Sequence, residues 1–382
     1  MKQDELKTLL YDEIAKCNRC GFCLAHCPIY TVEGREWATP RGKNALIRGV
    51  IEGKIDWTPE IEKTIFRCTG CRLCTQTCFP GVETNTGVLA GRECLVDRKL
   101  YPKVIDRVIE ALDTHHNIVN EPNANRSMWL DSLDNLPAHK YQKEKAEVIY
   151  FVGCVAAFFP LAAKIPQTFV QILDKAHVDF TLLGGEEWCC GFPMIQAGMK
   201  DKMEKLVEHN QKKVKDLGAK TVVFACPSCY HTWKEKYDTG AELLHSTQFM
   251  ERLISEGRIT FNNGVQKTVT YHDPCDLGRN SKVFEPPRNV LNKIPGVSLV
   301  ELPNNRQLSI CCGGGGDLEM VDPDLSAAIA RKKIEEIQST GADEVVTSCQ
   351  QCVRTISGNA RKNKIKLKVK DITEVVLEAM GA

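Results

Sequence analysis

Short, continuous apolar runs recur along the chain from residue 148 onward. They occupy residues 148–152, 178–183 and 221–225, and then residues 268–271, 297–302 and 344–346. Between them lie segments whose apolar residues recur every three or four positions, at 167–176, 201–216, 286–294 and from Asp322 onward. Uninterrupted apolar strands that alternate with helices are typical of parallel sheets covered on both faces. The pattern therefore predicts an α/β fold with two tandem βαβαβ units.

The chain before residue 113 lacks such strand-like runs. Apolar residues at helical spacing predict short helices at 45–55 and 59–66, and a further helix at 87–100. Residues 113–147 are rich in Asn and Pro and show little periodicity, which is typical of a linker. We therefore predict an α-helical domain over 1–112, a linker over 113–147, and two α/β domains over 148–262 and 263–382.

Cysteine is the outlier of the composition. The 382 residues include 19 cysteines, while 50 basic and 49 acidic side chains leave a net charge of +1, which gives no reason to expect nucleic acid as a partner. Disulfides would require export, yet residues 1–16 are charged throughout, and the longest uncharged apolar run, 148–163, is too short to span a bilayer. An odd count also fits poorly with complete pairing. We expect a cytoplasmic protein, without a membrane span, whose cysteines bind metal.

Eight cysteines form two runs of identical spacing. They read Cys17-x2-Cys20-x2-Cys23-x3-Cys27 and Cys68-x2-Cys71-x2-Cys74-x3-Cys78. This spacing holds two [4Fe–4S] clusters in bacterial-type ferredoxins, where the last cysteine of one run ligates the other cluster. It predicts a first four-cysteine site (Cys17, Cys20, Cys23 and Cys78) and a second four-cysteine site (Cys27, Cys68, Cys71 and Cys74). Zinc is disfavoured because zinc motifs use pairs of cysteines and close at four ligands.

Ten further cysteines form a duplicated pattern. We define a first five-cysteine site by Cys154, Cys189, Cys190, Cys226 and Cys229, and a second five-cysteine site by Cys275, Cys311, Cys312, Cys349 and Cys352. Equivalent cysteines are offset by 121 to 123 positions, so the second half of the chain is an internal duplication. Each cysteine group follows a predicted strand, and the thiols are expected to converge at one sheet edge. Five thiolates exceed the closed tetrahedral set of zinc.

These motifs resemble known families. The forty residues between Cys27 and Cys68 give residues 1–112 a likeness to the helical ferredoxin domain of succinate dehydrogenase iron–sulfur subunits. The duplicated pattern resembles the cysteine-rich CCG domain. Nearly the whole chain resembles the heterodisulfide reductase family, in the form that fuses a two-cluster ferredoxin domain to two CCG domains.

The resemblance implies a noncubane [4Fe–4S] cluster at each five-cysteine site, in addition to two cubane clusters at the four-cysteine sites. It also implies that the ten cysteines are catalytic, because the two noncubane clusters of the family deliver one electron each to a disulfide. The sequence carries no flavin or nicotinamide fingerprint. We therefore expect a partner, either a flavoprotein or a membrane cytochrome b-type subunit, through which any membrane association would be made.

A second hypothesis stays open. Relatives with the same layout pass electrons between a flavin dehydrogenase, of the lactate, glycolate or electron-transfer-flavoprotein type, and a quinone. Others are relays within bifurcating complexes. On this hypothesis the chain is a non-catalytic electron relay.

Weaker signals concern a lone cysteine and three residues near the motifs. Cys94, the nineteenth cysteine, is expected to be an inert buried thiol in a helix. His272 and Asp273 could supply a proton beside Cys275, although a hydrogen bond around the site or turn chemistry is favoured, and the same holds for His231.

Two tryptophans and a glycine run complete the candidates. Trp188 and Trp233 are predicted to pack near the ligands and exclude water. Residues 313–316 are four glycines, but they lack the lysine and the spacing of a phosphate loop, so no nucleotide site is predicted there.

Overall fold

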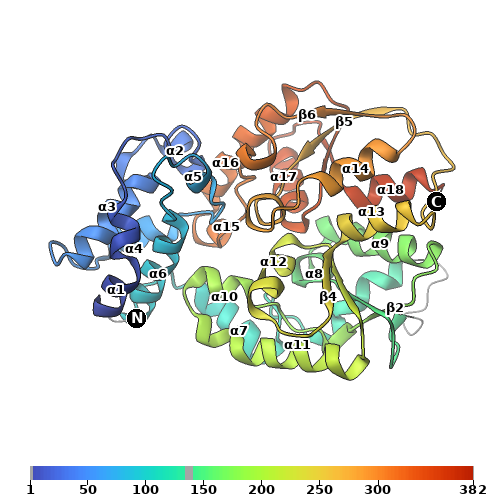
Figure 1. Cartoon of the computed structure of the whole chain (residues 1–382), viewed down its shortest axis with the longest axis horizontal. Helices are drawn as coiled ribbons and strands as arrows, with labels where there is room; N and C mark the ends of the chain where they lie inside the picture. The colour runs from blue at the N-terminus through green and yellow to red at the C-terminus, as the bar shows by residue number, and fades with distance from the viewer. Residues whose placement is uncertain (1–2, 134–140, 382) are drawn as a thin grey trace.

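The computed structural model describes residues 3–133 and 141–381, which form a helical part and two α/β units. Figure 1 shows the N-terminal helices, in blue, at one side of the two sheets. The helical part consists of α1 (Gln3–Ala15), α2 (Pro28–Glu33), α3 (Pro40–Ile51), α4 (Pro59–Phe66), α5 (Leu73–Gln76), α6 (Thr84–Asp97) and α7 (Ile105–His115). Its packing is apolar, with Ile47, Ile65 and Leu95 fully buried.

Threonine caps and prolines set where these helices begin. The Thr39 side chain accepts a hydrogen bond from the Gly42 amide at the start of α3, and Thr58 accepts one from the Ile61 amide at the start of α4. A proline follows each cap, where its missing N–H costs nothing. The predicted helix 59–66 is confirmed at the same bounds. The helix predicted at 45–55 begins earlier, at Pro40, because the cap lies there.

Each α/β unit contains a four-stranded parallel sheet. The first sheet has the order β2-β1-β3-β4 and the second the order β6-β5-β7-β8. The strands are β1 (Val148–Phe151), β2 (Phe180–Leu182), β3 (Thr221–Phe224), β4 (Glu242–His245), β5 (Lys267–His272), β6 (Val297–Glu301), β7 (Glu344–Thr347) and β8 (Lys368–Asp371). The central pairs have the same register in both units, for example Tyr150 opposite Val223 and Tyr271 opposite Val346. The duplication and the α/β class are thus confirmed.

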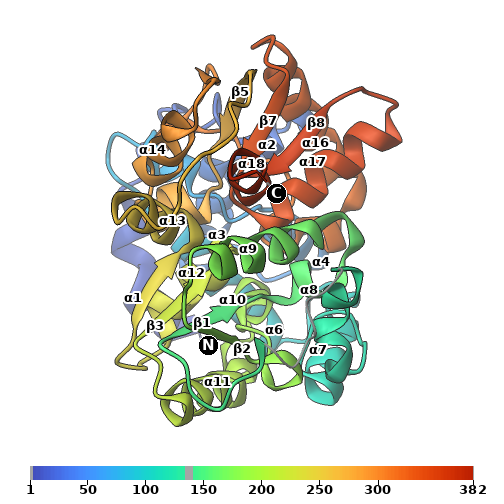
Figure 2. The same cartoon turned by 90° about the vertical axis from the view of Figure 1, so that its right-hand side faces the viewer.

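Helices cover both faces of each sheet, as the apolar strands required. In the first unit they are α8 (Cys154–Phe158), α9 (Lys164–Lys175), α10 (Phe192–Ala197), α11 (Glu204–Leu217), α12 (Pro227–Lys236) and α13 (Ser246–Ser255). In the second they are α14 (Glu285–Lys293), α15 (Leu318–Val321), α16 (Pro323–Gln338), α17 (Gln350–Lys362) and α18 (Ile372–Ala379). The two units meet through α9 against α18 and α13 against α14 (Figure 2).

The structure differs from the predicted elements in two respects. Each unit has a fourth strand, β4 or β8, that the apolar pattern did not predict. Both are short edge strands whose first residue is exposed, and edge strands carry charged side chains such as those of Lys368 and Lys370. In addition, α9 begins at Lys164, so Pro166 lies within its first turn, where proline is tolerated.

The segment predicted as a linker contributes to the first unit. Residues Asn123–Ser132 form a 3-10 run that packs against the loop after β2. Trp129 and Leu130 of this run, together with Tyr141, belong to the apolar core of the α/β units. Residues 134–140 lie outside the described part of the chain, and the domain boundaries stay a prediction.

Candidate metal centre

The four cysteines of the first four-cysteine site line one small cavity. Cys17, Cys20 and Cys23 follow α1, and Cys78 reaches the same cavity from the loop before α6. Cys74 also lines this cavity, so the second run adjoins it. Burial raises the pKa of Cys23 to about 11, and nearby Cys17, Cys27 and Cys78 add to the shift. Thiolates at these positions would repel one another, and a bound cation would relieve that repulsion.

The second four-cysteine site is lined by Cys27 from the first run and Cys68, Cys71 and Cys74 from the second. The structure therefore brings together the crossed sets of cysteines that the spacing predicts. Lys43, whose side chain is only 2% exposed, lines the same cavity and donates to the Ala38 carbonyl at 2.5 Å. Burial lowers the pKa of Lys43, while Cys68 and Cys27 oppose that shift. A buried ammonium beside four thiols would favour their ionised form.

All five cysteines of the first five-cysteine site line a cavity of about 370 Å³. They follow the carboxyl ends of β1, β2 and β3, where the loops of a parallel sheet converge. The opposite wall comes from the second unit and comprises Gly314, Gly315, Gly316, Asp317, Glu319, Met320, Gln351 and Arg354. Gly191, directly after Cys190, has φ 88°, which lets the chain turn away beside the thiols.

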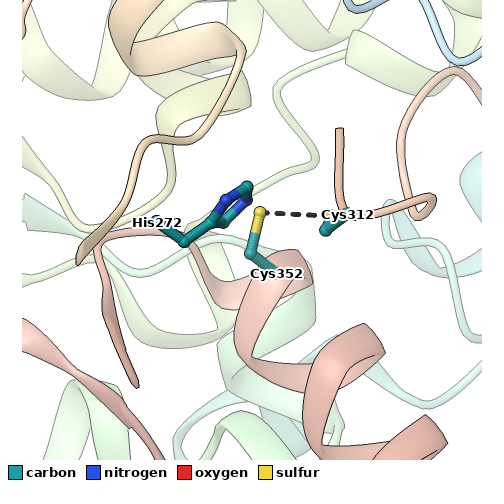
Figure 3. Close-up of side chains that lie close together, drawn as sticks. All are labelled: His272, Cys312 and Cys352. Atoms are coloured by element: carbon teal, nitrogen blue, oxygen red, sulfur yellow. Dashed lines mark hydrogen bonds between the residues drawn. The ribbon is translucent and has the colours of Figure 1, made fainter. Parts of the chain in front are cut away.

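The second five-cysteine site has the same relation to β5, β6 and β7. The Sγ atoms of Cys312 and Cys352 lie 3.3 Å apart, and the Gly313 amide donates to the Cys311 Sγ at 3.4 Å. The ring of His272 lies beside this pair (Figure 3), and the ligating atoms of the three residues are within 4.8 Å of one another. Burial holds the pKa of His272 well below its usual value, so the imidazole is neutral. The His272 Nδ1 is buried without a hydrogen-bond partner among the described residues, and the hydrogen-bonding role expected for this residue stays a prediction.

The two five-cysteine sites share an electrostatic pattern. Hydrogen bonds from Cys189 and Cys229 lower the pKa of Cys190 to about 6. At the equivalent position, hydrogen bonds from Cys311 and Cys352 hold the pKa of Cys312 well below its usual range. In each adjacent cysteine pair, the second thiol is thus the one that ionises first. The thiolate is the form that binds metal.

The second four-cysteine site adjoins the second five-cysteine site. Cys71 packs with Cys311 and Cys275, and the Arg279 Nε donates to the Cys71 carbonyl at 2.7 Å. The cavity of about 370 Å³, in contrast, lies at the first five-cysteine site.

The buried side-chain amide of Gln350 links the two α/β units. It accepts a hydrogen bond from the Ala156 amide at 3.0 Å and donates one to the Val152 carbonyl at 2.7 Å.

Two arginines fix the helical part against the α/β units. Arg92, which is 1% exposed, donates to the carbonyls of Ile65, Phe66, Cys68, Gln196 and Gly316. Its contacts thus join all three parts of the chain. Arg67 donates to Asp322 at 2.6 Å and pairs with Glu33 at 2.6 Å. These arginines hold the loop that bears Cys68 in place.

Sequence reasoning missed several charged residues at these sites. Arg126 donates to the Cys154 Sγ at 3.4 Å, and it comes from the segment predicted as a linker. Lys43, Arg92 and Arg279 were also missed. A basic residue within an apolar helix stripe, as Lys43 is in α3, was the available signal. For Arg126 no local pattern exists, because its partner Glu187 lies 61 positions away.

The two tryptophans have aromatic surroundings. Trp233 is fully buried against Phe151, Phe224 and Tyr237. Trp188 is stacked between His116 and His209, with ring centroids 3.6 and 3.7 Å away. Their proposed exclusion of water stays a prediction.

The remaining candidates, Cys94, Asp273 and His231, lie in three different environments. Cys94 is buried in α6. Asp273 forms a buried ion pair with Arg288 at 2.7 Å, which is a structural role. His231 lines a cleft together with Arg72 and Asp276.

The donor set fits iron–sulfur clusters. All 19 cysteines are free thiols. Thirteen of them line three cavities as the two sets of four and the first set of five, and the other five, the second set of five, are joined by contacts between their side chains; Cys94 belongs to none of these sets. Thiolates in such sets are the usual protein ligands of iron–sulfur clusters. Among the helices of residues 3–133 and 141–381, none is both long and apolar enough to cross a membrane.

Comparison with known families agrees with this geometry. Residues 148–234 and 269–357 match the family described as a cysteine-rich domain, CCG. Residues 13–82 match the family described as a 4Fe–4S dicluster domain. The matches define the class of the protein: an iron–sulfur protein in which a dicluster part precedes two CCG domains.

The relatives identify the family. The chain is 31% identical over 401 residues to the D subunit of the dihydromethanophenazine:CoB–CoM heterodisulfide reductase of Methanosarcina acetivorans, covering 97% of this chain and 94% of the relative. The protein of the same name from Methanosarcina barkeri is 32% identical, with the same shares covered. The chain belongs to the family of these heterodisulfide reductase subunits and is an iron–sulfur oxidoreductase subunit of that type.

More distant similarities extend to two further proteins. The EtfAB:quinone oxidoreductase of Syntrophomonas wolfei is 25% identical, and the match covers 96% of this chain but 58% of that protein. A solved structure of a hypothetical protein from Helicobacter pylori superposes with a TM-score of 0.60 at 10% identity, over 100% of this chain and 77% of the other. That superposition shows a shared fold only.

Proposed function

We propose that the chain is the catalytic iron–sulfur subunit of a heterodisulfide-reductase-like enzyme that reduces a disulfide or runs in reverse. The observation that carries this proposal is the cavity of about 370 Å³ lined by all five cysteines of the first five-cysteine site. A bound cluster would fill the part of this cavity next to the five thiols, and the part next to Glu319, Met320 and Arg354 of the second unit would be the space for a substrate, which a relay does not need. The relatives named as heterodisulfide reductase subunits support the same reaction class.

The proposed cluster ligands are the cysteines of the two sets of four and the two sets of five. The two four-cysteine sites would each hold a cubane [4Fe–4S] cluster, and the two five-cysteine sites would each hold a noncubane cluster. These clusters, when bound, supply electrons one at a time. The contact of Cys71 with Cys311 supports a route from the second four-cysteine site to the second five-cysteine site, and from there to the cavity.

The chain's own residues would bind the disulfide and keep water away. Val155, Phe159 and Met320 give the cavity apolar walls. At its rim Arg354 pairs with Glu319 and lies 4.5 Å from the Phe159 ring centroid. Reduction of a disulfide consumes two electrons and two protons and yields two thiols. Asp317, whose pKa burial raises to about 7, lines the cavity and is the proposed proton donor.

The electron partner would dock over the first four-cysteine site. Phe22 and Phe79, which are 63% and 86% exposed, flank Cys20, Cys23 and Cys78 of that site. Large exposed apolar side chains of this kind mark interaction surfaces. We propose that a flavoprotein or a cytochrome b-type subunit covers them. On this proposal Phe79→Ser slows reduction by the partner and leaves reduction by dithionite unchanged.

A second function is favoured by the more distant relatives. The EtfAB:quinone oxidoreductase and the probable iron–sulfur-binding oxidoreductase FadF of Bacillus subtilis match most of this chain. On this alternative the chain relays electrons between a flavin dehydrogenase or bifurcating complex and a quinone. The cavity would then hold the cluster alone.

Reoxidation of the reduced protein distinguishes the two functions. The anaerobically purified, reduced protein is mixed with a panel of disulfides, and the return of cluster absorbance is followed. Rapid two-electron reoxidation by a disulfide, lost in Cys190→Ala and Cys312→Ala, is the result expected of a reductase. Reoxidation by a flavoprotein or quinone-linked partner alone would contradict the catalytic proposal.

A further inference from the structure

A buried arginine contacts a thiol of the first five-cysteine site. The Arg126 Nη2 donates to the Cys154 Sγ at 3.4 Å, and its Nη1 donates to the Glu187 carboxylate at 2.8 Å. The side chains of Arg126 and Glu187 are each 1% exposed. A charged pair is rarely removed from water in this way, because desolvation of both groups is costly.

The surroundings fix the guanidinium in one position. The Arg126 Nε donates to Asn123 at 3.1 Å, and the guanidinium lies 5.3 Å from the Phe158 ring centroid. Glu187 in turn accepts from the amides of Val152 and Gly153, both at 2.8 Å, directly before Cys154. The cation is thus held against the loop that presents the thiol.

The duplicated second site lacks this arrangement. The offset of 122 residues puts Ser309 where the first unit has Glu187. The nearby Arg279 donates to the carbonyls of Cys71, Gln307 and Ser309, and not to a thiol. Among the hydrogen bonds of the described residues, only Arg126 brings a cationic side chain onto a sulfur of either five-cysteine site.

We propose that Arg126 sets the redox potential of the first five-cysteine site and makes it easier to reduce. The proposal rests on the proposed function, since it assumes a cluster bound by Cys154 and its four partners. Reduction adds negative charge to the cluster and its sulfur ligands. A fixed cation that donates a hydrogen bond to one of those sulfurs stabilises the reduced state, and hydrogen bonds to sulfur are a known determinant of cluster potential.

A difference in potential between the two five-cysteine sites gives electron transfer through the chain a direction. The second four-cysteine site adjoins the second five-cysteine site, whereas the cavity lies at the first. A higher affinity for the electron at the first five-cysteine site draws it toward the cavity. Arg126 therefore acts on the reaction through the potential of the first five-cysteine site, as a positioning residue that does not contact the substrate.

The alternative is a structural role alone. Arg126 could simply hold residues 123–132 onto the first unit through Glu187. In that case its loss would lower stability and would not change the potential. A redox measurement separates these roles.

The test is a potentiometric titration of the protein by electron paramagnetic resonance. It is carried out in a Cys311→Ser, Cys312→Ser background, so that a single five-cysteine site remains. Arg126→Gln should lower the equilibrium constant for reduction of that site at least tenfold, which is 59 mV for one electron. Arg126→Lys keeps the buried charge pair with Glu187 and serves as the variant that folds. It should lower the equilibrium constant for reduction several-fold, because a lysine cannot donate to both Cys154 and Glu187 in the fixed geometry of a guanidinium.

Arg288 provides the matched control. It is 3% exposed and pairs with Asp273 at 2.7 Å in the second unit, where its hydrogen bonds go to oxygen atoms. Arg288→Lys should leave the potential of the first five-cysteine site unchanged. An unchanged potential in Arg126→Lys, at full iron content, would overturn the inference. If the protein with all its cysteines binds iron only at the four-cysteine sites, the proposed function itself fails, and the iron content shows this before any titration.

Discussion

The glycine run 313–316 gives the sharpest prediction from the fold. Gly316 has φ 61°, and a methyl group on its Cα would lie 2.6 Å from the Thr69 carbonyl carbon and closer still to the Cys68 carbonyl oxygen. These are backbone atoms of the loop that carries the second four-cysteine site. The glycine is needed because the second α/β unit and the ferredoxin loop approach each other backbone to backbone.

The expected magnitude follows from two terms. A left-handed conformation costs a residue with a side chain about 1–2 kcal/mol. Overpacking against a neighbour that cannot move adds typically 1–3 kcal/mol. Gly316→Ala should therefore destabilise the protein by about 2–5 kcal/mol. Gly341→Ala is the matched control: Gly341 has φ 67°, but nothing lies within 4 Å of the added methyl group, so only the first term applies.

The assay is urea unfolding of the iron-loaded protein, followed by cluster absorbance and by far-ultraviolet circular dichroism. Gly316→Ala should unfold at a clearly lower urea concentration than Gly341→Ala. It should also slow electron transfer from the four-cysteine sites to the five-cysteine sites, because the methyl group separates the loops that hold them. Equal urea midpoints for the two variants would refute the close approach as the reason for this glycine.

Three further predictions concern single side chains. Burial raises the pKa of Asp317 to about 7, so the folded state keeps a proton that the unfolded state releases near pH 4, and stability should fall as pH rises from 4 to 7. Asp317→Asn should reduce this slope in urea midpoints measured across that range, and the slope that is left comes in part from Asp371, whose pKa burial also raises to about 7. Cys78→Ser should remove the cluster that Cys17 helps to hold and leave the electron paramagnetic resonance signal of the Cys68 site, whereas loss of the Cys68 signal instead would contradict the crossed assignment. Cys94→Ala should leave the iron content unchanged, and a loss of iron would identify Cys94 as a ligand.

The sequence predicted the central features of the fold because they depend on local patterns. Apolar strand runs and the 121–123-residue repeat identified six of the eight strands and their parallel arrangement. The edge strands β4 and β8 were missed, since a half-exposed strand such as Lys368–Asp371 has no continuous apolar run. Thr39 and Pro40 show that caps, which the apolar pattern does not contain, decide where a helix begins.

What the sequence by itself determined is the chemistry: 18 cysteines in sets of four and five, whose spacing predicts iron–sulfur clusters. Only the tertiary structure decided how the sets are related. Cys71 lies against Cys311, Gly316 against Cys68, and Arg126 against Cys154, although these pairs are 240, 248 and 28 positions apart in the chain. Spacing governs which thiols of one short motif can reach the same metal centre, because the loop between them is short. The packing of separate units governs which centres are neighbours and which charge faces each, and no local pattern records that packing.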